Sequence, residues 1–196
     1  MRIDLSINRI IRFLTVSDIL MLSGWGLVSP IFAVFVTDQI QGGDVKVAGL
    51  AMTVFLLTRS LTQVPIAWVI DRKRGEIDDF WVMIGGSLII SFSAFLFIFA
   101  RVPIHVFLIQ VLHGFGTALS FPSWMAIFTR HIDRRKEGFE WSIYFSTTGL
   151  GGALAAGLGG VIASYLGFAP LFLLVGLVSF LGTAFLFVFY EDLKMK

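Results

Sequence analysis

The sequence has no cysteine, which excludes disulfides, thiolate metal sites and cysteine nucleophiles. Its histidines and carboxylates show no metal-ligand spacing, no glycine-rich loop is placed to bind a phosphate, and no serine–histidine pair has the context of an intramembrane protease. We therefore predict neither an enzyme nor a bound cofactor or metal. Linkers, low-complexity runs and polar stretches long enough for a soluble domain are missing as well.

Apolar segments make up most of the chain. Hydrophobic residues form 57% of it, with 21 Phe against 3 Tyr, and its mean hydropathy is +0.88. Soluble domains contain roughly 45–50% apolar residues, whereas a transmembrane helix needs roughly 20 consecutive ones. We predict an all-α integral membrane protein in which residues 1–196 form one six-helix transmembrane domain, with helices at about 11–36, 47–70, 80–100, 104–128, 141–165 and 169–190.

The distribution of Lys and Arg predicts the orientation of these spans. With six spans both termini lie on one side, and Lys46 and Arg101 are the only basic residues expected on the other, while Arg59 lies within a span. Positive loops stay in the cytoplasm, so we expect a multi-pass protein of the plasma (inner) membrane with cytoplasmic termini. Its pI near 9.2 then reflects topology, and no nucleic acid is expected as a partner. The terminal side holds Arg2, Arg9, Arg12, Arg72, Lys73, Arg74, Arg130, Arg134, Arg135, Lys136, Lys194 and Lys196.

The loop after the second span carries a recognisable motif. Asp71 and Arg72 match the core of the pattern Gly-x-x-x-Asp-Arg-x-Gly-Arg, which joins helices two and three in the major facilitator superfamily. Ala67 stands at the first glycine, and Arg74 at the second, with Gly75 following.

Two further segments are similar to motifs of the same family. Residues 110–118 in span four are similar to Arg-x-x-x-Gly-x-Gly-x-Ala, with Gln110 in place of the arginine that is tied to proton coupling in some members. Residues 151–160 in span five resemble the glycine-rich motif of the antiporter branch, with Ala155 and Ala156 where that motif has Gly-Pro. The chain therefore resembles the six-helix N-terminal half of a transporter with two three-helix repeats. Neither the proton coupling nor the antiporter label is carried over.

The resemblance also implies a cytoplasmic gate. In this superfamily helix five of one half meets the helix-two equivalent of the other half. Asp71 would then accept hydrogen bonds from the N-terminus of a partner's span five, where the helix dipole favours a carboxylate. We assign the gate to Ala67, Asp71, Arg72, Arg74 and Arg134. The alternative is a solvated basic loop that only sets topology.

Span five is dense in small residues, which allow close helix contacts in lipid. They form two neighbouring ridges, so we expect either packing within the six-helix unit or contact with a second unit. The ridges are Gly149, Ala153 and Gly157, and Gly152, Ala156 and Gly160.

Two charged residues fall inside predicted spans, where a central charge costs about 2.5–3.5 kcal/mol on insertion scales. Arg59 lies near the middle of span two, and Asp18 lies in span one. Arg59 either pairs with Asp18 as a buried strut or faces a cavity and binds an anionic group. Gln63 is polar and lies one turn from Arg59.

Three ring side chains also fall inside predicted spans. His113, near the middle of span four, is either a proton site, since its ordinary pKa is near 6.5, or a neutral histidine bonded to a neighbouring helix. Trp25 and Trp124 lie inside spans near Pro30 and Pro122, and they either line a cavity or pack in the core.

We predict a secondary transporter that moves a small solute by alternating access, with the lipid bilayer and a second copy of the chain as partners. The solute is anionic if Arg59 faces the cavity. Alternating access requires two halves, which a homodimer would supply. Three alternatives remain: half of a heteromeric transporter, a fragment of a twelve-helix protein, and a membrane scaffold that does not transport.

Overall fold

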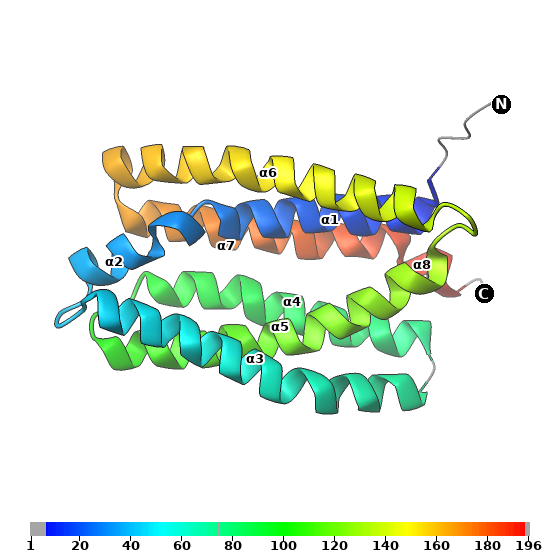
Figure 1. Cartoon of the computed structure of the whole chain (residues 1–196), viewed down its shortest axis with the longest axis horizontal. Helices are drawn as coiled ribbons and strands as arrows, with labels where there is room; N and C mark the ends of the chain where they lie inside the picture. Colours follow the sequence, from blue (N-terminus) through cyan, green and yellow to red (C-terminus); the bar gives the residue numbers. More distant parts are fainter. Residues whose placement is uncertain (1–6, 74, 195–196) are drawn as a thin grey trace.

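The computed structural model describes residues 7–73 and 75–194, and this part of the chain is built from helices joined by short loops (Figure 1). It contains the six expected membrane-spanning segments, each long and apolar enough to cross a bilayer. Their helices are α1 (Arg9–Gly26), η1 (Ser29–Ile31) and α2 (Phe32–Gln39) in span one, α3 (Val45–Lys73), α4 (Glu76–Phe97), α5 (Pro103–His131), α6 (Glu137–Leu166), and α7 (Phe168–Phe185), η2 (Leu186–Phe189) and α8 (Tyr190–Lys194) in span six.

Span one is broken, whereas we predicted one helix over about 11–36. Pro30 cannot donate a backbone hydrogen bond, and its ring collides with the carbonyl four residues before it. The chain therefore leaves α1 at Gly26 and passes through the 3₁₀ turn η1 into α2. At the break the Leu27 carbonyl lies against Gly159 of α6, where a Cβ atom would be only 1.7 Å from the oxygen. The glycine thus lets α6 pack directly onto the broken backbone.

The packing of the helices repeats after three spans. α1 packs on α6 and α7, α5 packs on α3 and α4 in the same way, and α4 joins α7. Exchanging spans one, two and three with spans four, five and six leaves these neighbours unchanged. Burial follows the same rule, because the most apolar stretches of spans one and four are both 39% buried and those of spans two and five are both 11% buried. This is the expected pair of three-helix repeats.

Two aromatic-rich clusters form the core, one toward each end of the bundle. The cluster at the end of the α2–α3 and α6–α7 loops contains Phe35, Phe97 and Phe172. The cluster at the end where α1 begins contains Phe80 and Phe128. Between them the bundle is less completely filled, and the predicted polar residues lie there.

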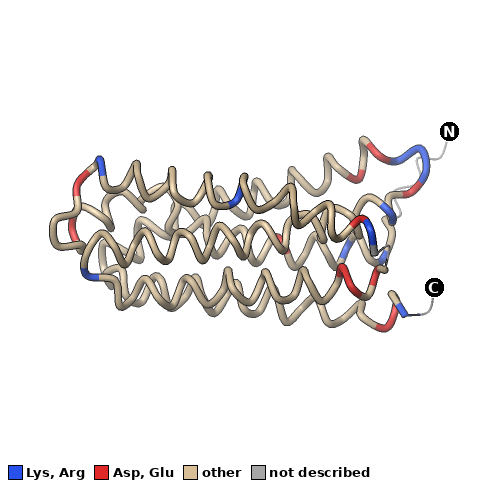
Figure 2. The backbone as a smooth tube through the Cα atoms, turned by 90° about the horizontal axis from the view of Figure 1, so that it is seen from below, with Lys and Arg blue, Asp and Glu red and all other residues tan. Residues whose placement is uncertain are grey.

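Charged residues gather at the two ends of the bundle and leave its middle nearly free of them (Figure 2). α1 begins and α8 ends at the same end (Figure 1), where Arg9 Nε lies 3.4 Å from Asp192 Oδ2. A charge-free middle is what a hydrocarbon environment requires, because an unpaired charge there is costly.

Candidate functional site

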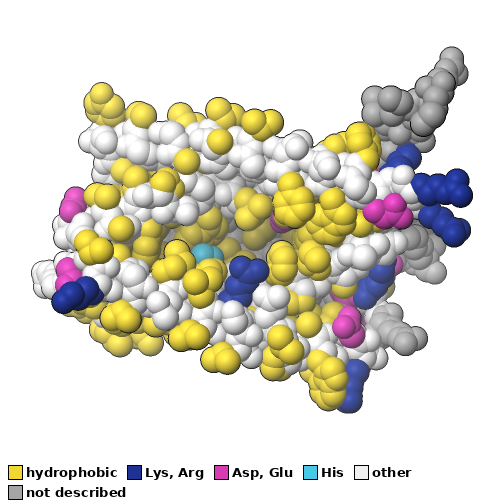
Figure 3. All heavy atoms as spheres, in the orientation of Figure 1, with side chains coloured by type: hydrophobic (Ala, Val, Ile, Leu, Met, Phe, Trp, Pro, Cys, Tyr) yellow, Lys and Arg dark blue, Asp and Glu magenta, His cyan; other side chains and the backbone are white. Residues whose placement is uncertain are grey.

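A pocket of about 250 Å³ lies at mid-height between the α1–α6 side and the α3–α5 side of the bundle. Figure 3 shows this face, where a histidine side chain lies recessed between apolar side chains and a basic side chain lies beside it. Five of our six predicted solute-binding residues line the pocket. They are Asp18, Trp25, Arg59, His113 and Trp124.

Arg59 reaches this pocket from α3 and is held by neutral groups. Its Nε donates to Gln63 Oε1 over 3.1 Å, which brings the sixth predicted residue to the site. Its guanidinium lies 5.0 Å from the centre of the Phe121 ring, within the range of a cation–π contact. Its two terminal nitrogens donate to no described residue, so they remain able to bind an anionic group.

Asp18 reaches the same pocket from α1. Its Oδ2 accepts a hydrogen bond of 2.7 Å from the Tyr144 hydroxyl of α6. No ion pair joins Asp18 to Arg59 among the residues that the structure describes, so the strut that we considered is not formed. An acidic and a basic side chain therefore share one pocket while each is bonded to a different neutral partner.

Aromatic rings form much of the pocket wall. The Trp25 and His113 rings stack with centroids 3.9 Å apart. The His113 ring also contacts the Phe55 ring, with centroids 4.7 Å apart. Trp124 stacks on Phe128 at 4.7 Å. The indole nitrogens of both tryptophans and Nδ1 of His113 are buried without a hydrogen-bond partner in the described chain. Such groups are costly to leave unpaired, which favours a polar occupant nearby.

A second hollow of about 470 Å³ lies between α3 and α5, toward the end where α3 finishes. Ala67 and Asp71 of the predicted gate line it, together with Gln63 and Arg130. Arg72 stacks on the Trp68 ring at 3.5 Å. Arg134 is exposed in the α5–α6 loop, and Arg74 lies outside the described residues.

Comparison with protein families agrees with this arrangement. The family model of the Major Facilitator Superfamily matches residues 14–195. The chain belongs to this superfamily. Its members are transporters, so the protein is a multi-pass integral membrane protein of a transporter family. A search of curated proteins found no match.

Sequence reasoning missed an ion pair and a neighbouring histidine–carboxylate contact at the end where α3 finishes. Arg130 at the end of α5 donates to the fully buried Asp79 of α4. Beside it, His131 Nε2 lies 3.7 Å from Glu76 Oε2. The available signal was the acidic first turn of span three, which faces the basic end of span four.

The small residues of α6 divide into two sets. Gly151, Ala155 and Gly159 face α1, since Gly151 lies against Ser23, and Ala155 against Gly26. The predicted ridges have more room beside them, because a Cβ atom added at Gly149, Gly152, Gly157 or Gly160 would meet nothing within 4 Å, although the Gly152 backbone lies against Gly26 of α1. In the first ridge Ala153 is exposed, and in the second Ala156 is half-buried. Most of this ridge surface is therefore not used by packing within the chain.

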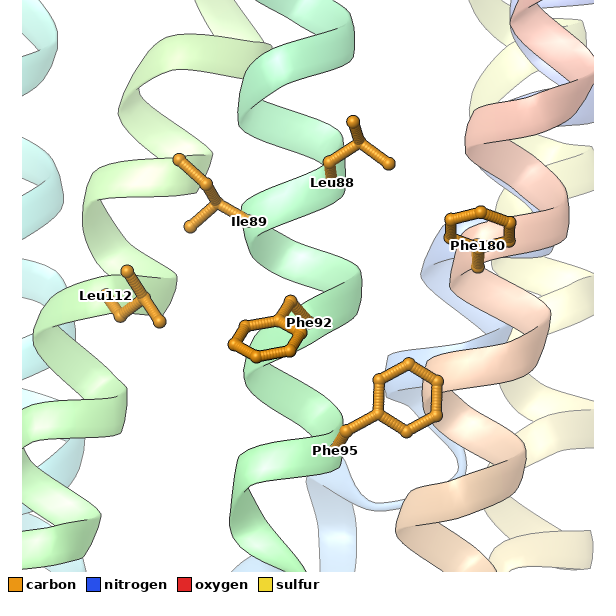
Figure 4. Close-up of a pocket in the computed structure, with 6 residues that line it drawn as sticks. All are labelled: Leu88, Ile89, Phe92, Phe95, Leu112 and Phe180. Atoms are coloured by element: carbon orange, nitrogen blue, oxygen red, sulfur yellow. The ribbon is translucent and has the colours of Figure 1, made fainter.

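A third hollow, of about 420 Å³, has a different character. It lies between α4, α5 and α7, and only Leu and Phe side chains with one Ile line it (Figure 4). Leu88, Phe92 and Phe180 are exposed on its rim. Such a surface suits contact with lipid tails and has no group that would recognise a polar solute.

Proposed function

We propose that the protein is a secondary transporter of a small solute, which binds in the pocket lined by Asp18, Trp25, Arg59, His113 and Trp124. One observation carries the proposal: Arg59 lies at mid-membrane depth, lines a pocket and pairs with no described carboxylate. Intramembrane charges usually mark the path of a substrate or ion. The solute carries an anionic group, because a guanidinium with two terminal nitrogens to offer binds carboxylates or phosphates in a bidentate manner.

We further propose that transport proceeds by alternating access in a homodimer. The binding site of such a transporter lies between two halves that rock about it. α3 and α6 flank the pocket and are the least buried spans, at 11% each. A second copy placed on this face would cover both helices and close the pocket, and a two-fold axis along the membrane normal would relate the copies. Both termini face the cytoplasm of the plasma (inner) membrane in this proposal, following the basic loops.

In the same proposal the loop after α3 is a cytoplasmic gate. Asp71 is exposed and lies in the hollow beside Arg130. It would bind the first turn of the partner's α6 in one state and release it in the other. Ala67 leaves room for the close approach, while Arg72, Arg74 and Arg134 supply the basic surroundings.

Solute binding is tested by a thermal-shift screen of the purified protein against a broad library, followed by uptake into proteoliposomes. Arg59→Ala should remove stabilisation by the solute and its uptake, while the unliganded protein still elutes as a single species. The matched control is Arg101→Ala, which removes an exposed arginine at the outer end. A scaffold that does not transport would bind no solute in the screen, and unchanged uptake by Arg59→Ala would remove this residue from the mechanism.

The homodimer is tested by cysteine crosslinking, because the native chain has no cysteine. Ala67→Cys is placed in one tagged population and Ser142→Cys in another, because Ala67 lies one turn before Asp71 and Ser142 is an exposed residue just after the first turn of α6. The two populations are co-reconstituted in bilayers. A crosslink between the tags is expected. Leu88→Cys in place of Ala67→Cys is the control, since Leu88 lines the third hollow, between α4, α5 and α7, on another face. A monomer without a crosslink would contradict the homodimer, while capture of a different half-transporter would favour the heteromer. The fragment alternative predicts transport only when six further helices are supplied.

A further inference from the structure

We infer that the transported solute is a zwitterion: its anionic group binds Arg59, its cationic group binds Asp18, and its apolar body lies against the aromatic walls. This inference rests on the proposed function, because it assumes that the pocket binds a solute. It goes further by assigning the second charged group of the pocket to the solute as well.

The two charges come from separate walls of the pocket. Asp18 is on α1, and its hydrogen-bond partner Tyr144 is on α6, which packs against α1. Arg59 and its partner Gln63 are both on α3, which packs against α5. Each charge is thus tied to its own side of the bundle by a neutral side chain. The pocket keeps a negative side and a positive side instead of neutralising them in one ion pair.

This separation discriminates among solutes by charge. In a site with few waters, unit charges interact much more strongly than in bulk water. A solute with one negative charge gains from Arg59 but is repelled by Asp18, and a singly positive solute meets the reverse. A neutral solute leaves both charges without compensation, which is costly in a buried site. Only a solute that carries both charges, in the matching order, compensates both Asp18 and Arg59. The pocket therefore selects against neutral and singly charged solutes.

The remaining walls suit an apolar or aromatic body. Trp25, Phe55, Phe121 and Trp124 all line the pocket. Aromatic faces also attract cationic groups, which adds to the binding of an ammonium beside Asp18. The volume of about 250 Å³ is below the usual range of about 300–1,000 Å³ for ligand pockets, so the solute is small. An amino-acid-like zwitterion with a compact apolar side chain meets all these conditions.

The first test uses the wild-type protein in lipid nanodiscs at neutral pH and two probe series. Each series holds the body constant and deletes one charge. The first comprises L-phenylalanine, 3-phenylpropanoate and 2-phenylethylamine, and the second comprises L-leucine, 4-methylpentanoate and 3-methylbutylamine. Calorimetry should show the zwitterion binding at least tenfold more tightly than both analogues in at least one series. An analogue that binds as tightly as its zwitterion in both series would overturn the inference and leave the proposed function standing.

Two outcomes concern the wider library. If none of the six probes binds, the solute found in the broad screen decides: a zwitterion supports the inference, and a neutral or singly charged solute overturns it. If no solute of any charge binds, the proposed function fails, and this inference fails with it. The failures are therefore distinguishable.

The second test assigns each charge to its wall. Asp18→Asn should weaken zwitterion binding at least tenfold while the anionic analogue binds as well as before or better. Arg59→Gln should weaken zwitterion binding to the same degree and favour the cationic analogue. Asp38→Asn and Arg101→Gln are matched controls, because both residues are exposed at the outer end. Equal losses for zwitterion and anion in Asp18→Asn would contradict the role of Asp18. If a variant does not fold, the wild-type series still decides.

Discussion

α3 and α6 occupy equivalent positions in the two three-helix repeats, and the same small share of each, 11%, is buried. Their side chains differ in kind. α3 presents Arg59, which is bonded to Gln63, to the pocket, whereas α6 presents glycines at which an added Cβ would meet no described atom within 4 Å. α6 also supports α1, through the Tyr144 hydroxyl and through Gly159. Two equally exposed helices therefore differ in what they offer: α3 carries polar side chains at the pocket, and α6 carries small residues that allow close backbone contact.

The largest effect is expected when one methyl group is added to the face of α6 that packs on span one. In Gly159→Ala the new Cβ would be 1.7 Å from the Leu27 carbonyl oxygen, so backbone must shift. Overpacking typically costs about 1–3 kcal/mol and occasionally more, and a clash with rigid backbone belongs at the upper end of that range. Scanning fluorimetry in detergent should show a large fall in Tm. Gly157→Ala is the control, since its Cβ meets nothing within 4 Å, and it should leave Tm unchanged or raise it slightly. Equal Tm values for both variants would refute the close contact.

A smaller effect is expected where α6 holds the charge of α1. Tyr144→Phe removes the hydroxyl that donates to Asp18 and leaves a carboxylate with one donor fewer. Losing a buried hydrogen bond to a charged group costs about 1–3 kcal/mol. Tm should fall by less than in Gly159→Ala. Tyr165→Phe makes the same chemical change at a side chain that is 84% exposed, and its Tm should match the wild type. A Tyr144→Phe protein as stable as this control would argue against the Asp18 bond.

The smallest effect belongs to α3 and concerns binding more than folding. Gln63→Met keeps the length of the side chain but removes the acceptor of the Arg59 Nε hydrogen bond. A single hydrogen bond contributes about 0.5–1.5 kcal/mol, so solute affinity should fall about two- to thirteenfold while Tm changes little. Ser60→Ala, at the exposed position next to Arg59, should bind as well as the wild type. Calorimetry with the solute from the screen measures both, and equal affinities would show that Gln63 does not position Arg59.

The fold was largely predictable because lipid imposes simple rules. Apolar length determines the number of spans, and all six were predicted. The break in span one was harder, since Pro30 indicates a bend but not the residue at which the helix stops. In α6 three neighbouring registers consist of small residues, and a shift by one residue rotates the helix face by about 100°. Composition could not decide that Gly151, Ala155 and Gly159 would face α1.

The residues of the pocket and the partner of Arg59 were predictable, whereas the partner of Asp18 was not. A charge inside an apolar span is conspicuous, so Asp18 and Arg59 stood out. Gln63 lies one turn from Arg59, and residues four apart on a helix are known to be neighbours on its surface. Tyr144 is 126 residues from Asp18 in the sequence, and no local pattern joins residues so far apart. The Asp79–Arg130 pair was missed because the orientation rule weighs basic residues and nearly ignores acidic ones.

That long separation between Asp18 and Tyr144 also has a consequence in time. A ribosome adds about 5–20 residues per second, so the hydroxyl partner, 126 residues later in the chain, emerges roughly 6–25 s after the carboxylate. Throughout that interval span one contains an acidic group without its hydroxyl partner, and its insertion is correspondingly unfavourable. α1 also packs on α7, which follows α6 in the chain. α1 is therefore made well before the helices on which it packs, and it reaches its final surroundings only after the fifth and sixth spans have been synthesised.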